Sequence, residues 1–236
     1  MNDSMNFMLG GNLIWIIFIG FSLLSWVISS KLKNKFERYS KIPTANGMTG
    51  KEVAEKMLRD HGITGVKIGC VEGMLTDHYN PANATINLSK EVYYSASISA
   101  AAVAAHETGH AVQHAQSYAW LGLRSALVPI VSFASSYVQW ILLGGILLIV
   151  SMPNLLLVGI IMYAATTLFS IVTLPVEINA SHRALLWLGR SGITDYGTQD
   201  KAYDALKWAA YTYVNAALLS LASLFYYIMI FMGRRD

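Results

Sequence analysis

The most constraining feature of the sequence is a long stretch without charge. From Ser125 to Val176 there is no Asp, Glu, Lys or Arg, and such a run is long enough for two membrane crossings of about 20 residues each. Over the whole chain of 236 residues, 54% are apolar and only 13% are charged. A soluble domain averages about 25% charged residues, so we predict an integral membrane protein rather than a soluble or disordered chain.

Four apolar segments are predicted to cross the membrane as helices, with a polar insert after the first. The expected organisation is an N-terminal transmembrane anchor over 1–30, an α+β insert over 31–126, two transmembrane helices over 127–176, a polar helix and loop over 177–211, and a C-terminal transmembrane helix and tail over 212–236. Pro153 and Asn154 suit a tight turn between the two middle crossings. The expected fold class is mostly α, with about four transmembrane helices and a small α+β insert.

The basic residues predict the side of the membrane on which the polar segments lie. Of the 17 Lys and Arg residues, 15 lie within 31–126 and 175–211, and four crossings place both segments on one side. By the positive-inside rule that side is cytoplasmic, which predicts a multi-pass protein of the plasma membrane. Arg234 and Arg235 oppose this orientation, because they would lie outside. The net charge of +3 does not indicate a nucleic-acid partner.

The insert is predicted to combine helices with short strands. The pattern predicts a helix over 49–62, a strand over 66–71, a strand–turn–strand over 74–88 and an Ala-rich helix over 90–116. Thr49 and Glu52 form a capping-box pattern at the start of the first helix. We also expect an extended peptide to pair with the edge of the strand near 84–88.

Residues His106-Glu107-Thr108-Gly109-His110 carry the chemistry that the sequence predicts. On a helix, positions i and i+4 share a face, so the imidazoles of His106 and His110 can bind one zinc ion. Glu107 then lies beside the first ligand, where its carboxylate can take a proton from water that attacks a peptide carbonyl. The pattern therefore predicts a zinc site with Glu107 as general base.

A catalytic zinc ion has three protein ligands and an open fourth position, and two residues compete to be the third ligand. Glu177 lies just past the uncharged run and is the first acidic residue after Glu107. The alternative role for Glu177 is an interfacial ion pair with Arg183. His114 is the rival ligand, but it lies one turn further along the helix. A straight helix would not easily bring three histidines around one ion.

Three further residues are candidates for the catalytic machinery. His78 and Tyr79 end a predicted strand, and either side chain could donate a hydrogen bond to the oxyanion that forms on the substrate. The alternative for this stretch is a polar turn before Pro81. Arg183 follows Glu177 by six residues, so it either faces the site or contacts lipid headgroups.

Together these motifs resemble those of the zinc-dependent membrane metallopeptidases of the YugP type, a bacterial family. The resemblance rests on the stretches Thr76–Pro81, Ala105–Ala115 and Leu174–Ser181, and spacing and hydropathy agree from about residue 10 to residue 232. It implies zinc bound by His106, His110 and Glu177, with Glu107 as general base.

The family is distantly similar to the HtpX and Ste24 membrane proteases, which use two histidines and a downstream glutamate. This similarity favours Glu177 over His114 as third ligand and implies a zincin-like helix in the insert. Two positions depart from the family pattern. Asn179 stands where an acidic residue is expected, and His182 stands where an arginine is expected.

The favoured function is a membrane-embedded zinc metalloendopeptidase that hydrolyses peptide bonds of membrane or membrane-proximal proteins. Its expected cofactor is Zn²⁺, and its expected partners are protein or peptide substrates and the lipid bilayer. The alternative is a non-catalytic, zinc-stabilised membrane scaffold or adaptor, which needs the same metal ligands but has no need of Glu107. A metal transporter is disfavoured, because residues 125–176 lack the charged groups of an ion pathway.

Overall fold

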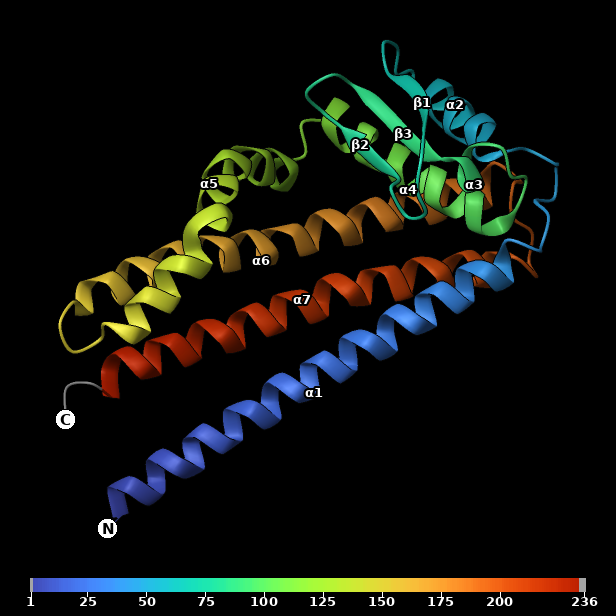
Figure 1. Cartoon of the computed structure of the whole chain (residues 1–236). Coiled ribbons are helices and arrows are strands. Elements are labelled where there is room, and N and C mark those ends of the chain that lie inside the picture. The colour runs from blue at the N-terminus through green and yellow to red at the C-terminus, as the bar shows by residue number, and fades with distance from the viewer. Residues whose placement is uncertain (1, 234–236) are drawn as a thin grey trace. The chain divides into compact units, whose positions relative to one another are not determined.

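The computed structural model describes the backbone of residues 2–233 and the side chains of residues 16–233. In chain order its elements are α1 (Asn2–Tyr39), α2 (Gly50–Asp60), β1 (Lys67–Val71), β2 (His78–Asn80), β3 (Thr85–Ser89), α3 (Lys90–Tyr93), α4 (Ile98–Ala115), α5 (Ala119–Leu147), α6 (Pro153–Arg190) and α7 (Gln199–Gly233) (Figure 1). The chain forms two units. The first comprises Met1–Ile28, Leu123–Thr173 and Thr212–Asp236, and the second comprises Ser29–Gly122 and Leu174–Tyr211.

The first unit consists of apolar helical segments. Helices α1, α5, α6 and α7 are each long and apolar enough to cross a membrane. At most 28% of the most apolar window in any of them is buried, and Trp26, Phe133 and Phe225 are 68%, 66% and 63% exposed. Apolar surface of this extent is stable against lipid rather than water. The prediction of a mostly helical chain with four candidate spans is confirmed.

Helix α6 is continuous from Pro153 to Arg190, although Pro175 lies inside it. A proline inside a helix removes one backbone hydrogen bond and can kink or end the helix. The helix continues for four further turns, so residues 176–190 remain helical. The segment that follows the uncharged run therefore presents its side chains at helical spacing.

The second unit contains a three-stranded sheet in the order β1–β3–β2. Strand β1 pairs with β3 in parallel, and β2 pairs with β3 antiparallel, with Tyr79 opposite Ile86. Ile86 and Leu88 are fully buried and belong to a core shared with α2, α3 and α4. Because β3 is the central strand, both of its edges are already paired. The expectation that a peptide pairs with the strand near 84–88 is therefore wrong, and the edges of the sheet are β1 and β2.

The single helix expected over 90–116 is divided into α3 and α4. Residues 42–44 pair with residues 96–98 through backbone hydrogen bonds, which holds the chain extended between the two helices. Ser97 then caps α4, since its hydroxyl accepts a hydrogen bond from the backbone N–H of Ala100. A long-range backbone contact has overridden the helical preference of the local sequence.

Candidate metal centre

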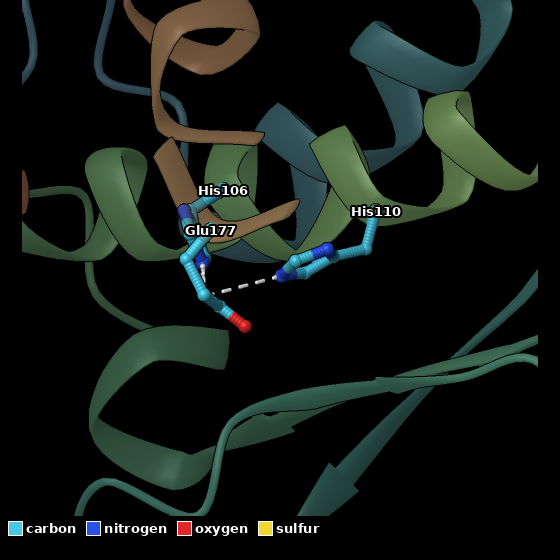
Figure 2. Close-up of side chains that lie close together, drawn as sticks. All are labelled: His106, His110 and Glu177. Atoms are coloured by element: carbon cyan, nitrogen blue, oxygen red, sulfur yellow. Dashed lines mark hydrogen bonds and ion pairs between the residues drawn. The ribbon is translucent and has the colours of Figure 1, made fainter. Parts of the chain in front are cut away.

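His106 and His110 lie one turn apart on α4, and their side chains point toward a common position (Figure 2). The centroids of the two rings are 4.8 Å apart. Almost all of α4 is buried, including the alanines at 100–105, whose small side chains let neighbouring elements pack closely. His110 is buried, and 12% of the His106 side chain remains exposed. The site therefore lies in the core of the second unit with one side reachable from outside.

Glu177 reaches the two histidines because α6 approaches α4 very closely. A Cβ atom on Gly109 would lie 2.8 Å from the carbonyl oxygen of Ala180 and 3.3 Å from its Cα. These are backbone atoms, which cannot rotate away as a side chain can. A residue with any side chain at position 109 would thus push the helices apart. Gly109 sets the distance at which α6 presents Glu177 to α4.

Three possible ligand atoms converge between the helices (Figure 2). The Oε2 atom of Glu177 lies 3.2 Å from Nε2 of His106 and 3.6 Å from Nε2 of His110. Ligand atoms of all three residues lie within 4.8 Å of one another. Two ligands of a tetrahedral zinc ion, each about 2.0–2.1 Å from the metal, are about 3.3 Å apart. The spacing and the donor set of two imidazoles and one carboxylate therefore fit zinc.

The charge of Glu177 makes the same position favourable for a cation. The Glu177 side chain is only 3% exposed, and a buried carboxylate is costly without a positive partner. Burial alone would lower the pKa of His110, but hydrogen bonding and attraction to Glu177 outweigh burial and raise this pKa. The pocket thus favours positive charge beside Glu177, which a divalent ion supplies.

The second nitrogen of each imidazole has a partner of its own. Nδ1 of His106 lies 3.0 Å from the hydroxyl oxygen of Ser181, and Nδ1 of His110 lies 3.0 Å from Oε1 of Gln113. Such contacts orient an imidazole and leave its Nε2 atom for a metal. Sequence reasoning did not single out Gln113. Its spacing of three residues after His110, on the same helix, is the only signal that could have found it.

Glu107 lies beside His106 on α4, with 9% of its surface exposed. Its Oε2 atom accepts a hydrogen bond of 2.9 Å from the backbone N–H of Tyr79. Among the described strands β2 pairs with β3 alone, and this N–H points away from β3. The unpaired edge of β2 therefore meets α4 at the Glu107 carboxylate.

Tyr79 and His78 lie on opposite faces of the sheet. The Tyr79 hydroxyl lies 2.7 Å from Nδ1 of His114, so this side chain faces α4. Because side chains alternate along a strand, His78 points to the other face, where its ring nitrogens contact the Thr76 carbonyl at 2.8 Å and the Asn87 amide at 3.1 Å. Among the described residues, the cluster of possible metal ligands consists of His106, His110 and Glu177. His114 is not part of it.

Arg183 is linked to the cluster indirectly, through Asn179 and Gln113. Its Nε atom donates a hydrogen bond of 2.7 Å to Oδ1 of Asn179, and its Nη1 atom donates one of 2.6 Å to Oε1 of Gln116. The guanidinium also lies over the ring of Tyr118, 5.9 Å from the ring centroid. Arg183 thus ties α6 to the end of α4.

A helical chain with four candidate spans and a buried His–His–Glu set is what a zinc-dependent peptidase of membranes requires. Comparison with known proteins supports this class. Residues 14–232 match the family described as "Putative neutral zinc metallopeptidase", and the chain belongs to that family.

The chain is also 44% identical over 213 residues to "Putative membrane protease YugP" of Bacillus subtilis (strain 168), a match that covers 90% of this chain and 94% of that protein. No solved structure matches the chain significantly. The resemblance predicted from the motifs is confirmed. The chain is therefore a zinc metallopeptidase, a hydrolase of peptide bonds, and the buried His–His–Glu cluster suits its zinc cofactor.

Proposed function

We propose that this chain is a membrane-embedded zinc endopeptidase in which His106, His110 and Glu177 hold the metal and Glu107 is the general base. The observation that carries the proposal is the convergence of these three side chains from two helices, with Glu107 adjacent to the first. Bound zinc supplies Lewis acidity, which polarises a peptide carbonyl and makes water a stronger acid.

The other chemical roles fall to residues of the chain itself. Glu107 accepts a proton from the attacking water and later passes it to the departing amine. The backbone N–H of Tyr79 holds the Glu107 carboxylate in place. We assign the oxyanion-stabilising role to the Tyr79 hydroxyl rather than to His78, because only the Tyr79 side chain lies on the α4 side of the sheet. Arg183 contributes indirectly, through Asn179.

In this proposal a substrate protein binds as an extended strand along the unpaired edge of β2. Edge strands commonly recruit extended peptides through backbone hydrogen bonds. The N–H of Tyr79 already bonds to Glu107, so a substrate would pair with the remaining backbone groups of this edge and lie beside Glu107. The four candidate spans of the same chain make membrane proteins and membrane-proximal segments the favoured substrates.

Replacing Glu107 with glutamine tests the catalytic proposal. The amide of a Glu107→Gln variant can still accept the hydrogen bond from Tyr79, but it cannot take a proton. We expect the purified full-length variant to keep its zinc and to lose about 10²–10⁴-fold in hydrolysis of an unfolded protein substrate. Chelation followed by zinc addition should restore hydrolysis in the wild type only.

Two results would count against this function. Hydrolysis that persists in Glu107→Gln removes Glu107 as the base. A wild-type protein that binds zinc tightly but cleaves no protein or peptide substrate supports the non-catalytic scaffold instead.

We further propose a plasma-membrane location with the metal centre on the cytoplasmic side. Support comes from the 15 Lys and Arg residues in segments 31–126 and 175–211. Cys70, the single cysteine of the sequence, is exposed on β1 and provides a natural probe. A membrane-impermeant maleimide should label Cys70 in inside-out vesicles but not in intact cells, with Cys70→Ser as the control. Labelling in intact cells overturns the orientation.

A further inference from the structure

Gln113 is a polar side chain with no exposed surface, and every polar atom of its amide has a partner. Its Oε1 atom lies 3.0 Å from Nδ1 of His110. Its Nε2 atom donates hydrogen bonds of 2.8 Å to the Val176 carbonyl and 3.0 Å to Oδ1 of Asn179. A single buried amide on α4 thus links one histidine of the cluster to two positions of α6.

The direction of this amide follows from its partners. The Val176 carbonyl can only accept a hydrogen bond, so the NH₂ group of Gln113 must face α6 and its oxygen must face His110. The hydrogen bonds of Asn179 indicate the same direction. The Arg183 guanidinium can only donate, and it contacts Oδ1 of Asn179, which leaves this oxygen as acceptor for Gln113. Neither amide can be reversed without placing like groups against each other.

We propose that Gln113 is a positioning residue that holds the proton of His110 on Nδ1, so that the Nε2 lone pair faces the metal beside Glu177. The oxygen of Gln113 can only accept, so the contact at 3.0 Å requires an N–H on the His110 side. This direction is imposed by the Val176 backbone at one end and by Arg183 at the other. The inference rests on the proposed role of His110 as a metal ligand.

The other histidine of the cluster lacks such a constraint. His106 contacts the hydroxyl of Ser181, and a hydroxyl can either donate or accept. The proton on Nδ1 of His110 is therefore held by the fold with or without the metal, whereas a proton on Nδ1 of His106 is not required by its neighbour. Because of this difference, we expect substitution of Gln113 to lower metal affinity more than substitution of Ser181.

Two substitutions separate positioning from simple packing. Gln113→Met and Gln113→Glu both remove the donors to Val176 and Asn179, but only Gln113→Met removes the acceptor for His110. If Gln113 only packs α4 against α6, both variants should lose affinity equally. If it positions His110, Gln113→Met should weaken zinc binding about 10–100-fold, and Gln113→Glu should stay close to wild type even where its melting temperature falls.

Zinc affinity is measured on full-length protein in lipid nanodiscs by competition with a chromogenic chelator, with Thr173→Val as the control. Thr173 is also a buried polar residue, on α6 outside the His106–His110 motif, and its hydroxyl donates a hydrogen bond to the Phe169 carbonyl of the same helix. The control should therefore keep wild-type affinity. Equal zinc affinity in wild type and Gln113→Met refutes the role of Gln113. Absence of zinc binding in the wild type instead refutes the proposed function.

A spectroscopic measurement remains decisive if Gln113→Met does not fold. In zinc-loaded wild-type protein labelled with ¹⁵N-histidine, the His110 proton should be found on Nδ1 and should exchange slowly with water. The same signal should persist in Gln113→Glu and exchange quickly in Gln113→Met. A wild-type spectrum in which the His110 proton lies on Nε2 overturns the inference without any variant.

Discussion

Gly109→Ala is the substitution that most directly tests how the metal centre is built. The added methyl group would lie 2.8 Å from the Ala180 carbonyl oxygen, whereas ordinary van der Waals contact begins near 3.4 Å. The backbone of α6 must therefore retreat by about 0.6 Å, which is 3.4 Å less 2.8 Å. Glu177 lies on the same face of α6, one turn before Ala180. The retreat therefore acts directly on the 3.2 Å and 3.6 Å contacts of its carboxylate.

The expected effects on stability and on the metal centre differ in size. Overpacking lowers the free energy of unfolding by about 1–3 kcal/mol. Replacing glycine by alanine inside a helix raises it by about 1 kcal/mol. The net loss of folding stability is thus about 0–2 kcal/mol. Misplacing a functional group by about 1 Å can cost about 10²-fold in rate. We therefore expect Gly109→Ala to remain folded while zinc affinity and hydrolysis each fall by about tenfold or more.

Gly122→Ala provides the matched control, because a Cβ at Gly122 meets no atom within 4 Å. It should keep its zinc and gain up to about 1 kcal/mol from helix propensity. Thermal unfolding, chelator competition and peptide hydrolysis are compared for both variants and the wild type. If Gly109→Ala matches Gly122→Ala in zinc affinity and hydrolysis, the close approach of the helices does not set the position of Glu177.

Two further predictions concern pH. Both imidazoles must be neutral to bind a metal, so zinc content should fall as pH drops below about 6, and metal fully retained at about pH 4.5 would argue against a site with two histidines. Asp77 accepts hydrogen bonds from the backbone and hydroxyl of Ser89, yet burial raises its pKa above the ordinary value. Folding therefore disfavours the charged form, and the stability contributed by Asp77 is complete at low pH and lost as pH rises through the raised pKa. Asp77→Asn should unfold at a higher temperature than the wild type near pH 7 and at a similar one near pH 3; a lower melting temperature at neutral pH would contradict this reasoning.

The sequence was sufficient for the parts of the site that depend on local spacing or on a simple count of charges. His106 and His110 had to share a face because four residues make about one helical turn. Glu177 could be predicted as a ligand because it is the first acidic residue after the uncharged run. The resemblance to proteases with two histidines and one glutamate supported this prediction. The structure unites these three residues.

Other features depended on contacts that local patterns do not encode. The break before α4 is caused by backbone pairing of residues 96–98 with residues 42–44. The local Ala-rich sequence does not indicate this pairing. The central position of β3 depends on the order of strands, which alternation alone does not define. The roles of Gln113 and Gly109 could not be predicted without knowing how α6 packs against α4. Gln113 bonds to the Val176 carbonyl, and Gly109 lies against the backbone of Ala180.

His106 and Glu177 are separated by 71 positions in the chain, and α5 and most of α6 lie between them. At about 5–20 residues per second, a ribosome needs roughly 4–14 seconds to pass from one to the other. During that interval the nascent chain carries both imidazoles but not yet Glu177, the carboxylate that completes the cluster. In the proposed site, zinc binding by all three residues can therefore begin only after α5 and most of α6 have been synthesised.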